Sequence, residues 1–523
     1  MKVKRIAVLC VAAAMMVGAL SGCTKSEKTG KNTNEKVKLT YWCDLPASAT
    51  SIITDLSETE LYKELEKRTN VEVEFLHPPA GQSGEQFNIM IASRDLPDMI
   101  EKDWSAYPGA ERKAAEDKIL IDFTDKVDEF APNLKKYLET ETPDAKKWVT
   151  TDGRYYVFPS LASYDSYVST VGPLIRKDLL DKLGLEMPTT MDEWEVVLRE
   201  FKKNGIKYPL SYRDNHTKWW YPFMGTYGAA RTFLQKDGEI KYGYIEPGMK
   251  EYLATMRRWL EEGLIDPDIL IMDEKTFGGK VINGEVGAWF GSISDIKAKG
   301  DEIKKIIPDA EVVGAPYPIP EGGDHCEIIY IDRRDGYTFA GAVGITTANK
   351  NVEETMKWLD YAYSEEGHML YNFGIEGESY TMVDGYPKYT ELITNNPNGL
   401  TMEQALAKYT RPTAAGYVDE RYMEQYYDLP AQREAAQMWS ANALLQEHGP
   451  TWRACYKLSV EESKELSEIT INFDNFVQEK FTKYLMGVES LDTFDDYVKQ
   501  LKDMGVNRAI QIYQTAYDRI MGK

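Results

Sequence analysis

The fold class follows from two stretches near the start of the chain, VKLTYW at residues 37–42 and VEVEFL at residues 71–76. Both alternate apolar and polar residues and are rich in β-branched and aromatic side chains, so they predict two strands. A predicted amphipathic helix at 56–68 lies between them, and a second helix at 86–94 precedes a short strand at 98–100. This β-α-β-α-β order favours a mainly parallel sheet covered by helices.

Helix signals recur farther along the chain. Thr190 and Glu193 have the spacing of a capping box, in which two side chains satisfy backbone N–H groups at a helix start. The apolar residues that follow recur at i, i+3, i+4 and i+7: Trp194, Val197, Leu198 and Phe201. Asn351 is expected to cap another helix, which ends before Gly367. Near the carboxyl end, two apolar stripes predict further helices: Phe473, Phe476, Val477 and Phe481, then Phe494, Tyr497, Val498 and Leu501.

The composition excludes several classes of protein. The 523 residues are 43% hydrophobic and 12% aromatic, which is incompatible with a disordered chain. They include 62 basic and 84 acidic residues, for a net charge of −22. A nucleic-acid-binding protein should be basic, because phosphate contacts dominate its affinity. We therefore expect a folded, acidic protein with more than one core and no nucleic-acid partner.

The first 22 residues are predicted to be a secretory leader. Lys2, Lys4 and Arg5 are followed by an uncharged apolar run at 6–20, shorter than the roughly 20 residues of a membrane-spanning helix. The residues Leu20-Ser21-Gly22-Cys23 resemble a bacterial lipobox. That resemblance implies a lipoprotein signal peptide at 1–22, cleavage before Cys23 and lipidation of its thiol, with a flexible polar tether completing residues 23–36.

Three cysteines remain in the rest of the chain: Cys43, Cys326 and Cys455. Their wide spacing lacks the CxxC pairs typical of zinc clusters and thioredoxin-type sites. One disulfide and three buried free thiols are both compatible with the sequence. No motif in the chain predicts a metal site or a cofactor.

Five segments in order resemble extracellular solute-binding proteins of ABC transporters, family 1. The similarity is to the large Gram-positive lipoprotein branch of oligosaccharide and aldouronate type. The segments are ASRDLPD (92–98), IRKDLLDKLGL with PTTMDEW (175–194), GEVGAWF (284–290), NFGIEGESY (372–380) and a tail from DYV (496–498) to YDR (517–519). Together they span nearly the whole chain after the leader.

The resemblance implies an α/β fold of the type II periplasmic-binding-protein class, in which two α/β lobes joined by hinge crossovers close on a ligand between them. Lobe 1 would hold residues 37–165 and 316–380, and lobe 2 residues 166–315 and 381–523. The crossovers would lie near residues 166–172, 313–316 and 380–386.

The function implied by the resemblance is that of a lipid-anchored substrate-binding component of an ABC importer. Such a protein captures an oligosaccharide in the cleft and delivers it intact to the permease transmembrane subunits, so it is not an enzyme. We expect a monomer at the extracellular face of the cytoplasmic membrane, held there only by its lipid.

Two alternatives to an importer receptor remain open. One is an extracellular glycoside hydrolase or lyase, whose two catalytic carboxylates would lie about 5–10 Å apart. The other keeps the fold but presents a non-sugar ligand to a sensor. The chain contains no HExxH, Walker A or GxSxG motif.

Aromatic residues are the first candidates for ligand binding, because flat rings cover the apolar faces of a sugar. Trp289 lies in the GEVGAWF segment, which in the family runs into the cleft; a core position is the alternative. Trp219 and Trp220 are consecutive rings beside polar residues, as expected of a loop. Trp42 ends the first strand next to Tyr41, and ligands of open α/β sheets bind beyond the carboxyl ends of strands.

Polar residues complete the expected site. Asp44 follows the first strand and can accept hydrogen bonds from sugar hydroxyls. Tyr380 and Glu376 lie in the glycine-containing NFGIEGESY segment, close to an expected crossover. Arg176 would contact the ligand or, alternatively, pair with Asp178.

The chain departs from the family pattern at two places. Large members often carry an acidic calcium loop after the PTTMDEW helix, but residues 201–209 (FKKNGIKYP) contain no carboxylate, so we expect no calcium there. Arg94 stands where relatives usually have glycine. If the ligand carries a uronate, Arg94, Arg176 and Arg231 are candidate bidentate partners for its carboxylate.

Overall fold

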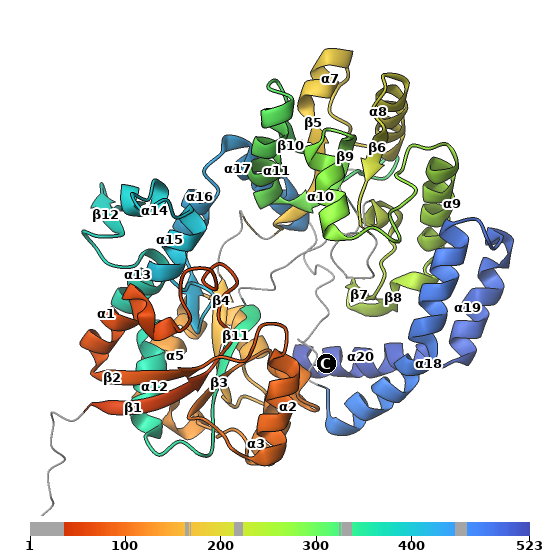
Figure 1. Ribbon diagram of the computed structural model, residues 1–523. Helices are drawn as coiled ribbons and strands as arrows, with labels where there is room; N and C mark the ends of the chain where they lie inside the picture. The colour runs from red at the N-terminus through yellow and green to blue at the C-terminus, as the bar shows by residue number, and fades with distance from the viewer. Residues whose placement is uncertain are drawn as a thin grey trace, which may run out of the picture. The chain divides into compact units, whose positions relative to one another are not determined.

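The computed structural model describes residues 36–162, 167, 169–213, 223–323, 326, 337–444 and 458–522. The expected leader and its Cys23, and also Trp219, Trp220 and Cys455, lie outside the described residues. Within the described ranges the strands form two main sheets and two hairpins, and helices cover the sheets (Figure 1). No helix in these ranges combines the length and apolar character needed to cross a bilayer.

The first sheet has six strands in the order β14-β4-β11-β3-β1-β2. The strands are β1 (Val37–Trp42), β2 (Val71–Leu76), β3 (Met99–Glu101), β4 (Val157–Ala162), β11 (Tyr337–Ile345) and β14 (Gly416–Val418). Strand β1 pairs in parallel with β2 and β3, whereas β11 runs antiparallel to β3 and β4. The parallel β-α-β-α-β opening predicted from the sequence is therefore confirmed.

Within the described ranges, eleven helices accompany the first sheet. They are α1 (Glu60–Thr69), α2 (Ser83–Ser93), α3 (Ala110–Glu116), α4 (Val127–Phe130), α5 (Pro132–Thr140), α6 (Lys146–Val149), α12 (Val352–Tyr361), α13 (Glu365–Phe373), α14 (Glu391–Thr394), α15 (Met402–Tyr409) and α16 (Glu420–Tyr426). Because successive strand residues point to opposite faces, Tyr41 enters the larger core of this sheet and Trp42 a smaller one on the other face.

The second sheet has four strands in the order β10-β5-β9-β6. The strands are β5 (Val171–Arg176), β6 (Tyr208–Ser211), β9 (Val286–Ser292) and β10 (Val312–Gly314), and β6 and β9 are parallel. The accompanying helices are α7 (Lys177–Leu183), α8 (Met191–Lys203), α9 (Pro247–Glu261), α10 (Glu274–Ile282), α11 (Ile293–Ile306), α17 (Pro430–Leu444), α18 (Val460–Leu485), α19 (Phe494–Asp503) and α20 (Val506–Met521). Their apolar faces share one large core with this sheet.

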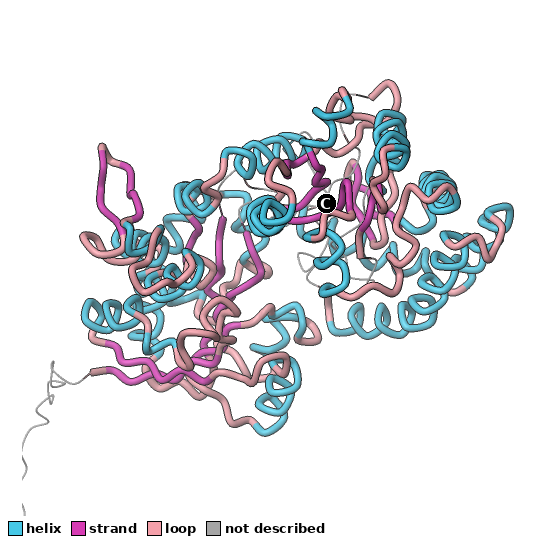
Figure 2. The backbone as a smooth tube through the Cα atoms, turned by 45° about the horizontal axis from the view of Figure 1, so that its top comes forward, coloured by secondary structure: helices cyan, strands magenta, loops and turns pink. Residues whose placement is uncertain are grey.

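The chain passes between the sheets from β4 to β5, from β10 to β11, and from β14 to α17. The third passage corrects the crossover expected at residues 380–386. There β12 (Tyr380–Val383) and β13 (Tyr386–Tyr389) form a hairpin, which projects beyond the helices beside it (Figure 2). Asp384 and Gly385 have φ values of 51° and 80°, as in the two-residue turns that match the twist of hairpin strands. Strand β14 then still pairs with β4.

Helix α17 is fixed to the second sheet through Trp439. This tryptophan is fully buried, and its Nε1 donates a hydrogen bond to the carbonyl oxygen of Ala315 at 2.8 Å. The indole occupies the space beside Gly172, where a Cβ would lie 2.2 Å from Cε2 of the ring. Gly172 follows the passage from β4 to β5, and Ala315 lies at the start of the passage from β10 to β11. The side chain of Trp439 therefore holds both of these passages against α17.

The predicted helix at 190–201 is confirmed in detail. Thr190 and Glu193 form the capping box of α8, and the four apolar residues of the predicted stripe are buried. The helix expected from Asn351 to Gly367 is instead two helices, α12 and α13. The break arises because Ser364 caps α13 by accepting a hydrogen bond from the backbone N–H of Gly367.

Arg94 has the left-handed backbone conformation, with φ of 60°, directly after α2. Glycine is favoured at this position of a helix end because it has no Cβ, which explains the glycine of the family pattern. The guanidinium of Arg94 donates to the carbonyl oxygen of Asp117 at 2.7 Å. Arg94 thus connects the end of α2 to the segment after α3.

Candidate functional site

The carboxyl edge of the second sheet is the place where an open α/β fold binds its ligand. Helix α8 ends shortly before β6 begins, so its amino end lies at the carboxyl end of that strand. Helix α9 runs beside α8: Arg258 pairs with Glu195 at 2.6 Å, and Lys202 donates to the carbonyl oxygen of Glu262. The amino ends of both helices therefore meet at this edge.

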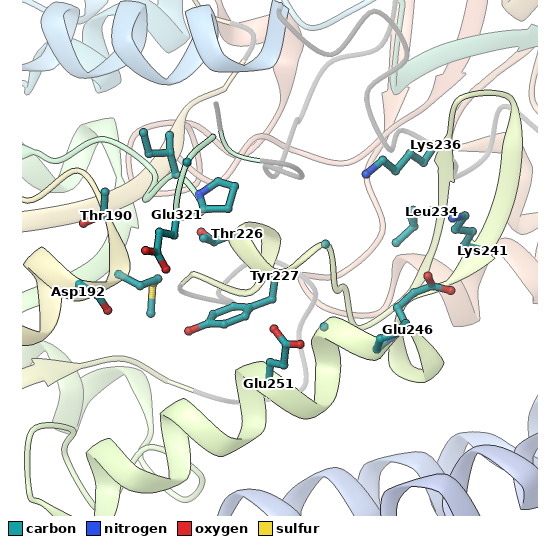
Figure 3. Close-up of a pocket in the computed structure, with 17 residues that line it drawn as sticks. Thr190, Asp192, Thr226, Tyr227, Leu234, Lys236, Lys241, Glu246, Glu251 and Glu321 are labelled. Carbon is teal, nitrogen blue, oxygen red and sulfur yellow. The ribbon is translucent and has the colours of Figure 1, made fainter. Parts of the chain in front are cut away.

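A cavity of about 660 Å³ opens between these two helix ends (Figure 3). Its walls are the start of α8, the short helix η5 (Met224–Tyr227), the hairpin of β7 (Phe233–Lys236) and β8 (Glu239–Tyr242), the start of α9, and residues 319–322. Thr226 fixes two of these walls together, because its hydroxyl donates to the carbonyl oxygen of Pro318 at 2.6 Å. A cavity of this size is typical of a small-ligand site.

Tyr227 supplies an aromatic ring to the cavity. Its hydroxyl donates to Oγ1 of Thr255 at 3.1 Å, which fixes the ring in place. Burial raises the pKa of the Tyr227 phenol, and the negative charges of Glu251 and Asp192 act in the same direction. Figure 3 shows Asp192, Glu251 and Glu321 around this ring. The arrangement offers a flat apolar surface bordered by hydrogen-bond acceptors.

The other end of the cavity is formed by the β7–β8 hairpin. Lys236 and Lys241 extend from it, with Glu246 at the entry to α9 close by (Figure 3). Lys241 lies opposite Leu234 in the hairpin register, and Leu234 also lines the cavity. The lysine ammonium groups at this end can donate hydrogen bonds to the oxygen of a sugar hydroxyl. The carboxylates at the Tyr227 end can accept a hydrogen bond from the O–H of such a hydroxyl.

A smaller cavity of about 190 Å³ lies at the carboxyl edge of the first sheet, between the segment after β1 and helices α15 and α16. Tyr422 and Tyr426 line it with their rings stacked, 6.0 Å apart between centroids. Arg411, which is 7% exposed, forms part of its wall and bonds Oε1 of Glu101 at 2.8 Å. Each sheet thus has a cavity with aromatic lining at its carboxyl edge.

A third cavity, also about 660 Å³, lies among α3, residues 147–153, the start of α18 and the end of α20. Its arginines are engaged: Arg112 pairs with Asp152 at 3.0 Å and Arg519 with Glu462 at 2.5 Å. The part of its lining that the structure describes contains no aromatic ring.

The predicted site residues that the structure describes lie outside these cavities. Trp289 is 1% exposed within β9, and its Nε1 has no hydrogen-bond partner among the described residues. Trp42 packs on Phe87 with ring centroids 6.1 Å apart. Tyr380 is 5% exposed and packs against Phe373. These three rings therefore lie in cores of the structure.

The polar predictions divide into two groups. Asp44 and Glu376 are exposed but line no cavity described above. Arg176 is 2% exposed and makes a bidentate pair with Asp178, at 2.7 and 2.6 Å. The structural alternative for Arg176 is thus the one observed.

Cys43 and Cys326 are both buried, and no disulfide joins them to each other. Among the residues that the structure describes, no group of three or more histidine, cysteine, aspartate or glutamate side chains is arranged to hold a metal ion. Residues 201–209, where the sequence predicts no calcium site, include the end of α8 and the start of β6.

Residues 50–369 match the family model of the bacterial extracellular solute-binding proteins. The match covers more than half of the chain, so the protein belongs to this family, as the sequence resemblance predicts. It is similar to the fructooligosaccharide ABC transporter substrate-binding protein FusA of Streptococcus pneumoniae, with 25% identity over 89% of this chain and 88% of that protein. It is also similar to lipoprotein LipO of Bacillus subtilis, with 23% identity over 97% and 96% of the two chains.

Among solved structures, the alginate-binding protein AlgQ2 superposes with a TM-score of 0.71 at 22% identity, covering 93% of this chain and 99% of the other. This likeness confirms the two-lobed α/β fold that the sequence predicts. Family and neighbours are binding proteins.

Proposed function

We propose that this protein is the substrate-binding component of an ABC importer, that it captures an oligosaccharide and that it delivers the sugar intact to a permease. The observation that carries the proposal is the cavity at the carboxyl edge of the second sheet, with Tyr227 bordered by carboxylates. The name of the related FusA supports an oligosaccharide as the ligand.

The chemistry of the cavity suits a pyranose or furanose ring. A sugar has apolar C–H faces and a rim of hydroxyls, so it needs a flat ring below and hydrogen-bonding groups around it. Covering one face removes about 60–80 Å² of apolar surface from water, worth about 2 kcal/mol. Hydrogen bonds to the charged groups of the rim add to this, since such bonds are stronger than neutral ones.

Replacing Tyr227 with alanine is expected to weaken oligosaccharide binding at least tenfold, because the stacking surface is lost. Tyr227→Phe keeps the ring and loses only the hydrogen bond to Thr255, so its affinity should stay within about threefold of the unmodified protein, less than the 1.4 kcal/mol of a tenfold change. Calorimetric titration of a sugar panel measures both variants. Equal affinities of Tyr227→Ala and the unmodified protein would exclude this cavity as the sugar site.

Turnover separates a receptor from a hydrolase or lyase. Oligosaccharides incubated with a catalytic amount of the purified protein should be recovered unchanged by chromatography. Products in excess of the protein would contradict the receptor function.

We further propose that the protein is anchored through a lipid on Cys23 at the extracellular face of the cytoplasmic membrane of a Gram-positive bacterium, as a monomer. The lipobox-like residues before Cys23 support this, as does the name of the related lipoprotein LipO. Anchoring that outlasts transient contact needs two acyl chains, because a single chain binds a bilayer only weakly.

Cys23→Ser is expected to leave the precursor uncleaved or to release the protein into the culture medium, because serine offers no thiol for the lipid. Fractionation and immunoblotting of cells that express the full chain measure this, with the Cys43→Ser variant as the matched control. Unchanged membrane attachment of Cys23→Ser would contradict the anchor.

A further inference from the structure

We infer that the oligosaccharide bound by this protein is uncharged and that uronate chains are rejected. This inference rests on the proposed function and specifies the substrate class of the same cavity. It follows from the charges around Tyr227 and from the way in which the arginines of the described residues are already engaged.

Three carboxylates border the ring of Tyr227 (Figure 3). Asp192 comes from the first turn of α8, Glu251 from the first turns of α9, and Glu321 from the segment after β10. None of the three makes an ion pair or hydrogen bond with another described residue. They are therefore available to accept hydrogen bonds from sugar hydroxyls, and they repel a second carboxylate brought to the same place.

A uronate needs a cation, best supplied by the bidentate fork of an arginine. Among the described residues that line the cavity there is no arginine. Of the three arginines suggested by the sequence, Arg176 is paired with Asp178, and Arg94 donates to carbonyl oxygens in the segment after α3. Arg231 donates to the hydroxyl of Tyr244 at 2.9 Å and to Gln478 at 2.8 Å, and its guanidinium lies over Phe481.

The described lining of the smaller cavity of the first sheet contains no lysine. The arginine in this lining, Arg411, bonds both Glu101 and Tyr62 at 2.8 Å, so its charge is already compensated. Glu403 also lines this cavity. A ligand that extends from one sheet to the other would therefore meet a carboxylate without a paired cation at both ends.

The lysines of the β7–β8 hairpin do not change this conclusion. Lys236 and Lys241 are at the opposite end of the cavity from Tyr227, and Glu246 lies beside them (Figure 3). A uronate chain carries one carboxylate on every unit, so the unit that stacks on Tyr227 brings its charge among Asp192, Glu251 and Glu321. A neutral sugar brings only hydroxyls there.

The test is calorimetric titration of the purified protein at low salt with matched trisaccharides. The neutral ligands are inulotriose, xylotriose, cellotriose and maltotriose, and the acidic ligands are trigalacturonate and trimannuronate. At least one neutral trisaccharide should bind at least tenfold more tightly than either uronate. A uronate that binds more tightly overturns this inference and leaves the proposed function standing. If neither class binds, the proposed function fails and the inference falls with it.

A charge-matched pair of variants then locates the discrimination. The cavity variant is Asp192→Asn with Glu251→Gln and Glu321→Gln. The control changes the exposed residues Glu74, Glu129 and Glu186 to glutamine, which shifts the net charge equally at sites outside the cavity. The ratio of neutral to uronate affinity should fall at least fivefold in the cavity variant and stay unchanged in the control. Equal changes in both variants would mean that long-range charge alone excludes uronates, which overturns the assignment to this cavity.

Discussion

Replacing Arg411 with methionine should lower the free energy of unfolding by about 3–5 kcal/mol, because it leaves one member of a buried ion pair without the other. Arg411 is 7% exposed, and its guanidinium bonds the Tyr62 hydroxyl and the Glu101 carboxylate, each at 2.8 Å. Methionine fills much of the volume of the arginine stem but carries no charge. Glu101, whose side chain is 13% exposed, then keeps its hydrogen bond from Tyr41 but loses the cation that balances its charge among the described residues.

A second variant separates the loss of charge pairing from a loss of packing. In the double variant Arg411→Met with Glu101→Gln the uncompensated carboxylate is gone, so most of the lost stability should return. Arg112→Met is the matched control, because Arg112 is 53% exposed in its pairs with Glu116 and Asp152; it should cost less than about 1 kcal/mol. Urea denaturation at neutral pH measures all three. A double variant as unstable as the single one would assign the effect to packing instead.

The elements that could be predicted from the sequence are those whose pattern is local. The α8 stripe and its capping box involve residues within a few turns of one helix, so spacing alone identifies them. The same holds for the stripes in α18 and α19, where Phe473, Phe481 and Phe494 are buried as predicted. The hairpin at residues 380–389, where the family resemblance implies a crossover, also has a local signal: its Asp384-Gly385 pair is typical of a tight hairpin turn.

The candidate site was harder to predict because its parts come from separate segments. Tyr227 belongs to η5, Asp192 to α8 and Glu321 to the segment after β10, and only the tertiary fold brings them together. One signal did point there: Thr190 marks a helix start at the carboxyl edge of a sheet, which is where ligands bind. Tyr227 itself has no local feature that distinguishes it from the other 33 tyrosines of the 34 in the chain.

Trp289 illustrates the converse difficulty. The burial pattern of β9 shows buried residues on both faces of the strand from Val286 to Gly291. In such a strand, period-two alternation carries no information about which side chain reaches a surface. The resemblance of this segment to the family therefore does not identify which of its residues, Trp289 or a neighbour, faces the cleft.

Gly248→Ala should both destabilise the protein and weaken sugar binding at least tenfold, because Gly248 determines where Tyr227 lies. Gly248 follows Pro247 in the first turn of α9 and lines the cavity. A Cβ at this position would lie 1.6 Å from the carbonyl oxygen of Tyr227. That oxygen belongs to the backbone, so η5 or the start of α9 must move, at a cost in unfolding free energy of about 1–3 kcal/mol or more. Either movement displaces the ring on which the sugar would stack.

The matched control for Gly248→Ala is another helical glycine with free space around it. Gly278 lies inside α10, where a Cβ would meet no atom within 4 Å. Alanine there should raise stability by about 0.5–1 kcal/mol, because it favours the helix without a clash. Both substitutions add one methyl group, but Gly248→Ala is expected to lower the free energy of unfolding and Gly278→Ala to raise it. Thermal unfolding and calorimetric titration measure them together. Wild-type stability and affinity in Gly248→Ala would mean that the backbone of η5 adapts without moving Tyr227, and that the close contact does not position the ring.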